Sequence, residues 1–445
     1  MRAWPSGKAS AFQADIRGSE SRRPLCKRSA FSLQLNMFSK WLSAEADCSL
    51  TWARSSVAER TAHNRLVVGS NPTGPIMSPL FHNVFQNQRV LVTGHTGFKG
   101  SWLSLWLREL GAQVTGYSLE PPTVPSNFAA SRLAERLVDL RADVRHLERL
   151  QEAFEKHAPQ VVFHLAAQPL VRESYALPVE TFDVNVMGTI NLLEAARQCS
   201  SVKAVICITS DKCYENQEWD QGYIETDRLG GRDPYSASKA MAELAIAAYR
   251  QSFFSQAEGA RALVASARAG NVIGGGDWGK DRLVPDCLCA LTEGRAIGIR
   301  NPASRRPWQF ILEPLSGYLW LAARLLEGEA SLAEAWNFGP PERTPVSVRE
   351  LAQKLVELWG TGSLEIQAPG PAPHEAGILS LSWEKAARQL QWQPVYDWQT
   401  ALAETVKWYQ TYYESEPKRD LYTACVQQIE AYSERARGLG LVWAG

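Results

Sequence analysis

Two side chains that can move protons stand four residues apart in the stretch YSASK, at Tyr235 and Lys239. On a helix this spacing places both on the same face. A phenol has a pKa of about 10, and a neighbouring ammonium group favours its ionised form. Tyr235 could then remove a proton from a hydroxyl group while a hydride leaves the same carbon. The spacing alone is common, so its meaning depends on the elements that position the pair.

An apolar run at 204–209 has the composition of a buried strand and closes with the hydroxyl residues Thr209 and Ser210. Either hydroxyl could hold a substrate hydroxyl in place, because the alternation of side chains along a strand does not settle the register. Asp211 and Lys212 follow directly. Titratable groups of both charges therefore stand beside the two hydroxyls.

A glycine-rich turn follows the first expected strand and leads into an apolar helix that starts near Trp102. Glycines permit a tight turn and a close approach of backbone N–H groups to a pyrophosphate, and a helix N-terminus favours that negative charge. Between a strand and a helix, the motif predicts a dinucleotide site. Its residues are Gly94, Thr96, Gly97, Phe98, Lys99 and Gly100.

The second expected strand ends at residues 116–120 without a carboxylate directly at its tip. A choice between NAD and NADP therefore does not follow from this strand. Glu120 could reach the ribose, or it could be a solvated loop charge. Asp143 and Val144 precede a helical pattern and are candidates for contact with the adenine edge, although Asp143 could instead cap that helix.

Short apolar runs alternate with longer amphipathic stretches from Met77 onward. This alternation predicts an α/β fold built on a doubly wound parallel sheet, with its ligand at the carboxyl ends of the strands. The pattern predicts strands at 89–93, 113–117, 161–165, 204–209 and 262–267, and helices at 179–197 and 236–253.

The composition changes near Gly270, where Gly, Pro and Trp become frequent. We expect a dinucleotide-binding Rossmann domain at 77–270 and a smaller C-terminal α/β domain, mainly substrate-binding, at 271–415. A helical tail is expected at 416–445.

The order of glycine-rich turn, strand ending in Ser210 and Tyr235-x-x-x-Lys239 is typical of the short-chain dehydrogenase/reductase family. Within its extended epimerase/dehydratase branch, the loop 209–216 (TSDKCYEN) resembles that of CDP-glucose 4,6-dehydratases. Related dTDP- and GDP-sugar dehydratases carry an Asp-Glu pair in place of Asp211-Lys212. Further resemblances lie at 165–169, 268–278 and 305–310, and the similarity runs from about Val84 to the region of Tyr412.

The resemblance implies that NAD oxidises C4 of the glucose unit of CDP-glucose, with Tyr235 as base and Ser210 and Lys239 beside it. Water then leaves C6 after loss of the C5 proton, and the hydride returns to C6, which gives CDP-4-keto-6-deoxyglucose. We assign Asp211 as the acid for the C6 hydroxyl and Lys212 as the C5 base. Asp211 must then be protonated and Lys212 neutral, and a bend after Ser210 must turn both side chains inward.

The resemblance also implies the remaining ligand contacts. Cofactor contacts are expected from Leu165, Ala166, Ala167 and Gln168, and substrate contacts from Asn271, Arg282, Arg306 and His374. A guanidinium fork suits phosphate oxygens, although Arg282 could instead form a surface salt bridge. His164, at the end of an apolar strand, is expected to be a hydrogen-bonded core histidine.

Lys plus Arg and Asp plus Glu both total 47, so no excess of charge points to nucleic acid or to an anionic membrane. The eight cysteines form no CxxC pair, and we expect no bound metal. No run approaches the roughly 18 apolar residues of a membrane span. We expect a cytoplasmic protein that binds a nucleotide sugar. The family resemblance adds a homodimer built from helices around 179–197 and 236–253.

Two other functions remain open. One is another nucleotide-sugar 4,6-dehydratase or a 4-epimerase, with a dTDP, GDP or UDP sugar, against which Asp211-Lys212 argues. The other is a non-catalytic dinucleotide-binding protein, against which the intact Ser210, Tyr235 and Lys239 argue.

Residues 1–76 differ from the rest of the chain, with eleven Lys or Arg against five Asp or Glu and no sustained helix or strand period. The segment 54–75 resembles the translation of a bacterial transfer-RNA gene. We expect a non-native or disordered extension that precedes a start at Met77. A basic targeting peptide is the alternative.

Overall fold

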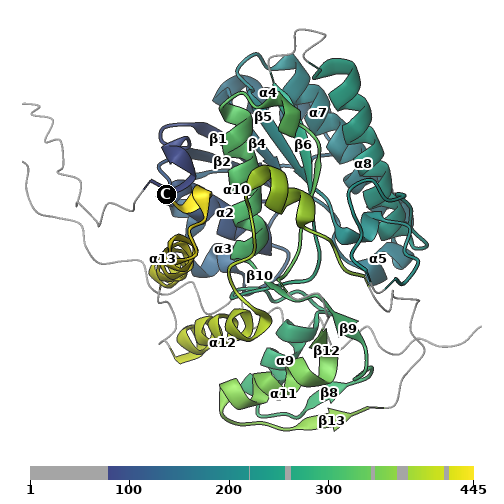
Figure 1. Cartoon of the computed structure of the whole chain (residues 1–445), viewed down its shortest axis with the longest axis vertical. Helices are drawn as coiled ribbons and strands as arrows, with labels where there is room; N and C mark the ends of the chain where they lie inside the picture. Colours follow the sequence, from purple (N-terminus) through teal and green to yellow (C-terminus); the bar gives the residue numbers. More distant parts are fainter. Residues whose placement is uncertain (1–78, 220, 256–261, 342–345, 368–378, 415–419) are drawn as a thin grey trace, which may run out of the picture. The chain divides into compact units, whose positions relative to one another are not determined.

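The computed structural model describes residues 79–219, 221–255, 262–341, 346–367, 379–414 and 420–445. They belong to one compact unit, Thr73–Gly445 (Figure 1). The expected extension at 1–76 and the predicted substrate ligand His374 lie outside the described residues.

Seven parallel strands form the central sheet in the order β11-β6-β5-β4-β1-β2-β3. The chain builds one half outward from β1 and then returns beside β1 with β4, as in a doubly wound sheet. The predicted fold class is confirmed. The strands are β1 (Arg89–Thr93), β2 (Gln113–Ser118), β3 (Val138–Arg141), β4 (Val161–His164), β5 (Ala204–Ile208), β6 (Leu263–Ala269) and β11 (Ala335–Phe338).

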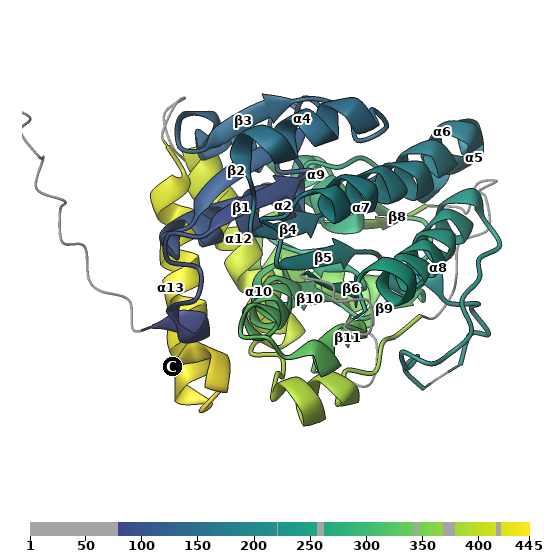
Figure 2. The same ribbon diagram turned by 90° about the horizontal axis from the view of Figure 1, so that it is seen from above.

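Two layers of helices cover the sheet, because successive side chains of each buried strand point to opposite faces. In β1, Val90 and Val92 join one apolar core and Leu91 joins the other. Figure 2 shows α7 and α8 on one side of the sheet and α10 and α13 on the other. The first layer holds α4 (Leu147–His157), α7 (Gly188–Gln198) and α8 (Pro234–Phe253), and the second holds α2 (Phe98–Glu109), α10 (Leu312–Leu326) and α13 (Tyr422–Gly438).

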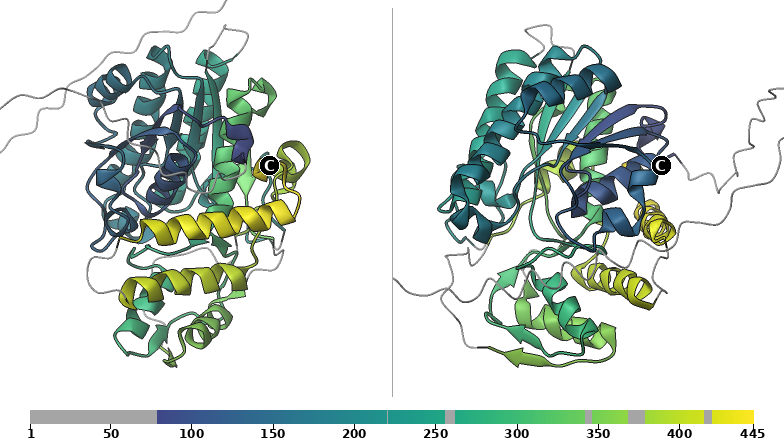
Figure 3. Two further views of the ribbon diagram at one scale, coloured as in Figure 1. Left: turned by 90° about the vertical axis from the view of Figure 1, so that its left-hand side faces the viewer. Right: turned by 180° about the vertical axis from the view of Figure 1, so that it is seen from behind.

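A smaller group of elements follows β6. Three short strand pairs join β7 (Val272–Ile273) to β10 (Gln309–Phe310), β9 (Arg305–Arg306) to β12 (Val346–Ser347), and β8 (Ile297–Ile299) to β13 (Leu364–Ile366). The helices α9 (Leu283–Thr292) and α11 (Val348–Trp359) pack on β8, and α12 (Trp398–Glu414) lies beside α13 (Figure 3).

The predicted boundary at residue 270 does not divide the chain into one segment for the central sheet and one for the smaller group. Helix α10 and strand β11 lie inside 271–415, yet β11 pairs with β6 in the central sheet. After its excursion through the smaller group, the chain returns by way of α10 to lie parallel to β6, which requires a crossover connection.

The first and last described turns pack against each other. The ring of Phe81, in η1 (Leu80–Asn83), stacks on Trp443, in η8 (Val442–Ala444), with ring centroids 5.1 Å apart. Phe81 also meets Trp106 of α2 edge to face at 5.6 Å. All three side chains are buried, so this aromatic group belongs to the main core. None of the described helices is both long and apolar enough to cross a bilayer.

Candidate active site

The glycine-rich turn after β1 packs directly on the loop after β4. Gly94 has φ +74°, and a Cβ atom there would lie 2.7 Å from the backbone nitrogen of Ala166. A Cβ atom at Gly100 would lie 2.0 Å from the carbonyl oxygen of Gly94. The turn therefore requires glycine at both positions, because any side chain would push the backbone layers apart. This close packing places the predicted residues Leu165 and Ala166 in contact with the turn. The contact lies between β1 and β4, where the strand order reverses.

This turn fits a dinucleotide. The N-cap of α2 is Gly97, whose lack of a side chain leaves the first N–H groups of the helix open to a pyrophosphate. Lys99 lies in the first turn of α2. Burial lowers the pKa of Lys99 to about 8, with a further lowering from Arg282 and an opposing effect from Asp211. The predicted cofactor residue Lys99 thus also reaches the groups expected to bind and convert the substrate.

The segment after β3 forms the part of the predicted dinucleotide site where the adenosine is expected. Asp143 accepts hydrogen bonds from the backbone N–H of Arg145 at 2.9 Å and from its guanidinium Nε at 2.9 Å. The N-cap of α4 is His146, so Asp143 does not cap that helix. Val144 is buried. Glu120 is 80% exposed and lies 3.6 Å from Arg141, which favours the solvated loop charge.

Tyr235 and Lys239 lie in the first two turns of α8, whose start is fixed by Pro234 and by the capping side chain of Asp233. Both side chains are buried. Burial raises the pKa of Tyr235 to about 12, although a hydrogen bond with Ser210 lowers it in part. Asp211 adds to the rise and Arg282 acts against it, so the protein groups alone do not lower the pKa of Tyr235. Burial also lowers the pKa of Lys239, to about 8.

The expected bend after Ser210 is present as a 3-10 turn, η4 (Asp211–Cys213), with Ser210 as its N-cap. The Ser210 hydroxyl accepts the backbone N–H of Lys212 at 3.2 Å and donates to Asp211 Oδ1 at 2.8 Å. Asp211 is buried, and burial raises its pKa even though Lys212 and the Ser210 hydrogen bond act against the rise. Its carboxyl group therefore keeps a proton more readily than an exposed one.

The structure distinguishes the two hydroxyls at the end of β5. Ser210 is hydrogen-bonded to Tyr235, whereas the Thr209 hydroxyl donates to Glu243 in the interior. Glu243 in turn forms a salt bridge with Arg268 of β6, with Nη2 and Oε2 2.7 Å apart and each side chain only 3% exposed. The sequence analysis missed this pair. Glu243 follows Lys239 by one helical turn, and this spacing could have found it.

The predicted substrate residues lie farther apart from one another than the candidate catalytic residues do. Arg282 Nη1 lies 2.8 Å from Oδ2 of the buried Asp277, and the Arg282 side chain is 35% exposed, so this salt bridge is partly buried. Arg306 lies in β9 and donates to the carbonyl oxygen of Arg305 at 2.9 Å. The backbone carbonyl oxygen of Asn271 accepts the N–H of Gln309 at 3.0 Å. The structure thus places Arg282 near Tyr235, while Asn271 and Arg306 lie on the neighbouring strand pairs.

Two other expectations concern the loop after β4. His164 bonds Thr93 Oγ1 at 2.8 Å through Nδ1 and Thr189 Oγ1 at 3.1 Å through Nε2. Burial lowers the pKa of His164 to about 3, so it is a neutral, hydrogen-bonded core histidine, as expected. The side-chain amide of Gln168 donates to the Leu170 carbonyl oxygen in its own loop and to Thr181 in the helix Pro178–Phe182. Ala167, which precedes Gln168 in the same loop, is partly buried.

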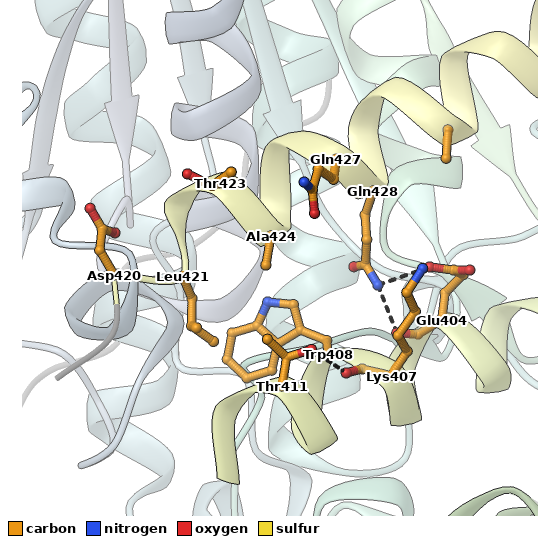
Figure 4. A pocket seen from close by; sticks show the side chains of 11 residues that line it. Glu404, Lys407, Trp408, Thr411, Asp420, Leu421, Thr423, Ala424, Gln427 and Gln428 are labelled. Carbon is orange, nitrogen blue, oxygen red and sulfur yellow. Dashed lines mark hydrogen bonds between the residues drawn. The ribbon is translucent and has the colours of Figure 1, made fainter. Parts of the chain in front are cut away.

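A cavity between α12 and α13 lies outside this constellation (Figure 4). At one end Gln428 Nε2 donates to the carbonyl oxygen of Glu404 at 2.7 Å, and Trp408 and Leu421 form the apolar part of the lining. None of the candidate catalytic, cofactor or substrate residues contributes to its lining.

A doubly wound sheet, a glycine-rich turn at its switch point, and Ser210, Tyr235 and Lys239 at the carboxyl edge together define an extended short-chain dehydrogenase/reductase. Residues 91–269 match the family model described as GDP-mannose 4,6 dehydratase. A CDP-glucose 4,6-dehydratase of Salmonella typhimurium is 48% identical over 352 residues, which cover 79% of this chain and 97% of that protein. The chain belongs to the CDP-glucose 4,6-dehydratase family, as the sequence resemblance predicted.

More distant relatives share the architecture. A dTDP-glucose 4,6-dehydratase of Escherichia coli is 25% identical over 347 residues, covering 72% of this chain and 92% of that protein. The structure of a dTDP-glucose 4,6-dehydratase from Streptomyces venezuelae with NAD and TYD bound has a TM-score of 0.63 at 24% identity, covering 75% of this chain and all of that one. A Thermus thermophilus UDP-glucose 4-epimerase in complex with NAD has a TM-score of 0.58 at 26% identity, covering 73% and 99%.

The glycine contact gives a direct test of the cofactor cradle. We expect Gly100→Ala to raise the Kd for NAD by about tenfold or more, equivalent to ~1.4 kcal/mol, because its Cβ atom must displace the turn. Isothermal titration calorimetry measures the change. Gly438→Ala, in α13, is the matched control, since no heavy atom other than its chain neighbours and its own helix backbone lies within 4 Å of a Cβ atom there. Native NAD affinity in a folded Gly100→Ala protein would contradict the assignment.

Proposed function

We propose that this chain converts CDP-glucose into CDP-4-keto-6-deoxyglucose with loss of water, with NAD as its cofactor. The observation that carries the proposal is the turn at the end of β5, which sets a buried carboxyl group with a raised pKa and an amine, Asp211 and Lys212, beside Ser210 and Tyr235. An epimerase needs no acid and base for an elimination, whereas a dehydratase does. The 48% identical relative supports CDP-glucose as the substrate.

The first step is oxidation of C4, and Tyr235 takes the proton of the C4 hydroxyl. Ser210, which is hydrogen-bonded to Tyr235, holds that hydroxyl in place. NAD, held by the turn with Gly94, Gly97 and Gly100, would supply the acceptor for the C4 hydride and the hydride that is added at C6. Because burial raises the pKa of Tyr235 to about 12, the phenol needs nearby positive charge to act as a base at neutral pH. Lys239, on the same helix face one turn away, contributes such charge.

The second step is elimination across C5 and C6. The C4 ketone makes the C5 proton more acidic, and Lys212 removes it and gives a proton back to C5 when the hydride is added at C6. Asp211 donates a proton to the departing C6 hydroxyl, and the buried environment that raises its pKa supports this role. The two groups act from one short turn, so a small shift of η4 changes the distance of both to the sugar.

We assign the nucleotide diphosphate to Arg306 and Arg282, with contributions from Asn271 and His374, and the cofactor mainly to residues 77–270. Arg282 supports this division, because it is held by the buried Asp277 and its charge acts on Tyr235. Residues 271–415 then supply most of the substrate contacts.

We further propose that the protein acts in the cytoplasm as a homodimer. Exposed apolar side chains gather on α8 and on the helices before it: Val179, Met187, Met241, Leu244 and Phe253 are between 46% and 81% exposed. Such a patch on a water-soluble fold favours a protein interface. The six cysteines within the described residues are all unpaired, which suits a reducing compartment.

The substrate is tested by incubating the purified protein with NAD and, separately, with CDP-, dTDP-, GDP- and UDP-glucose. We expect a base-sensitive 4-keto sugar from CDP-glucose and at least about tenfold lower kcat/KM with the other three, because one base-specific contact is worth about 1 to 3 kcal/mol. Equal rates with all four sugars, or a 4-epimer without loss of water, would overturn the proposal.

The C5 base is tested with Lys212→Met. We expect C4 oxidation, followed as reduced cofactor in a single turnover, to persist while formation of the 4-keto-6-deoxy product falls about a hundredfold. The C5 proton should fail to exchange with solvent deuterium. Asp211→Asn is the matched comparison, because it removes the acid and leaves the base, so C5 exchange continues while water loss slows. Native C5 exchange in Lys212→Met would exclude Lys212 as the base.

The proposed dimer is tested with Leu244→Glu, which places a charge in the exposed apolar patch. We expect light scattering after size exclusion to give a dimer for the native chain and a monomer for the variant, because an unpaired charge is costly to bury. Leu439→Glu, at an exposed leucine beside the end of α13, is the control and should stay dimeric. A native monomer would refute the proposed assembly.

A further inference from the structure

The turn that carries Asp211 and Lys212 is held only weakly by its own backbone. Within it, the N–H of Cys213 reaches the Ser210 carbonyl oxygen at 3.3 Å and the N–H of Tyr214 reaches that of Asp211 at 3.3 Å. Both hydrogen bonds are longer than usual. The N–H of Gly230 also donates to the Cys213 carbonyl oxygen at 2.9 Å. The position of the turn therefore depends on contacts from outside it, among them those of the flanking residues Thr209 and Tyr214.

Both flanking residues bind the same buried salt bridge. The Thr209 hydroxyl donates to Glu243 Oε1, and Arg268 Nη1 donates to the Tyr214 hydroxyl at 2.6 Å. Glu243 and Arg268 are joined to each other by the 2.7 Å contact between Oε2 and Nη2. At the end of β5 the chain is thus bound to Glu243 through Thr209, and five residues later it is bound to Arg268 through Tyr214.

The ion pair itself is firmly fixed. Burial alone would raise the pKa of Glu243, but the Arg268 guanidinium and hydrogen bonds from Thr209 and Ser266 lower it overall, so Glu243 is an anion. Ser266 donates to Glu243 Oε2 at 2.8 Å. The guanidinium carbon of Arg268 also lies 4.9 Å from the ring centre of Tyr214. A buried pair with this many partners has little freedom to move.

The contact continues beyond Tyr214. Its hydroxyl donates to Asn337 Oδ1 of β11 at 2.9 Å, and the Asn337 amide donates to the Tyr223 carbonyl oxygen at 2.9 Å. Arg268 also donates to the Glu225 carbonyl oxygen at 3.2 Å. The loop after the turn is therefore tied to the edge of the sheet through the same guanidinium group.

We propose that the Glu243–Arg268 pair is a positioning unit for the elimination step, with Tyr214 as the group through which it sets the place of Asp211 and Lys212. The inference rests on the proposed assignment of these two residues to elimination. Tyr235 and Lys239 stand on α8, outside the turn, whereas Asp211 and Lys212 belong to it and Ser210 is its N-cap. Loss of the Tyr214 contact should therefore impair elimination more than C4 oxidation, since a misplacement of about 1 Å can cost roughly a hundredfold in rate.

Tyr214→Phe tests the inference, because it removes one hydroxyl and keeps the ring. Glu243→Gln is a poorer test, since it leaves the Arg268 charge buried without a counter-charge and endangers folding. With CDP-glucose and NAD we expect elimination and C5 exchange to fall about tenfold or more, with KM and single-turnover C4 oxidation within about twofold of native.

Tyr223→Phe is the matched control. Its ring stacks on that of Tyr214 with centroids 5.2 Å apart, and its hydroxyl bonds Asn216 and the N–H of Gln217 rather than Arg268. We expect native rates for both steps in this variant. Equal slowing of C4 oxidation and elimination in Tyr214→Phe, or the same loss in Tyr223→Phe, would show general support of the fold and overturn the inference.

Amide hydrogen exchange decides the inference without substrate. Peptides that contain residues 210–214 should exchange about tenfold faster in Tyr214→Phe than in Tyr223→Phe, because only the first variant frees the turn. Equal exchange in the two variants would refute the positioning role. A native chain that leaves CDP-glucose unchanged would refute the proposed function instead, and the exchange comparison would still stand.

Discussion

A charge can be buried in a protein only when other polar groups replace the water that it loses. Arg268 and Glu243 meet this condition because several elements end at the same edge of the sheet. The end of β5 supplies Thr209, β6 supplies Ser266, and Asn337 stands opposite Arg268 on β11. The buried charges of Arg268 and Glu243 need these hydrogen-bond partners, and this need fixes the positions of the strand ends. The candidate catalytic residues are arranged around those strand ends.

A second constraint is the direct contact of backbones between the turn after β1 and the loop after β4. The sheet order places β1, β4 and β5 side by side, so the glycine-rich turn and the turn with Asp211 lie on either side of one loop. Lys99 from the first turn and Asp211 from the second shift each other's pKa. Hydride transfer needs a cofactor and a sugar carbon in contact, and this arrangement brings their binding elements together.

The features that the sequence predicted well are local ones. Glycine spacing, the Tyr235-x-x-x-Lys239 interval and the apolar runs of the inner strands each depend on a few consecutive residues. Strands β3 and β11 were missed, because each is short and pairs on only one side. The choice between Thr209 and Ser210 also needed the structure.

Burial was the quantity that the sequence could not supply. We expected a lowered pKa for Tyr235 from a neighbouring charge, but the sign depends on how much water the phenol loses, and burial raises the pKa to about 12. Arg268 and Glu243 are 25 residues apart in the sequence, and their contact depends on how α8 lies over β6. Resemblance to a known family found Asp211 and Lys212, whereas only coordinates showed what holds them.

The stacking of Phe81 on Trp443 has a consequence for biosynthesis. The two rings are separated by 362 residues, the difference between their numbers, so Phe81 leaves the ribosome long before its partner exists. At about 5 to 20 residues per second, the delay is roughly 20 to 70 seconds. During that interval Phe81 and Trp106 form an apolar surface without its final cover. Chaperones that bind nascent chains have that window in which to act, and this part of the core closes only after Trp443 has been synthesised.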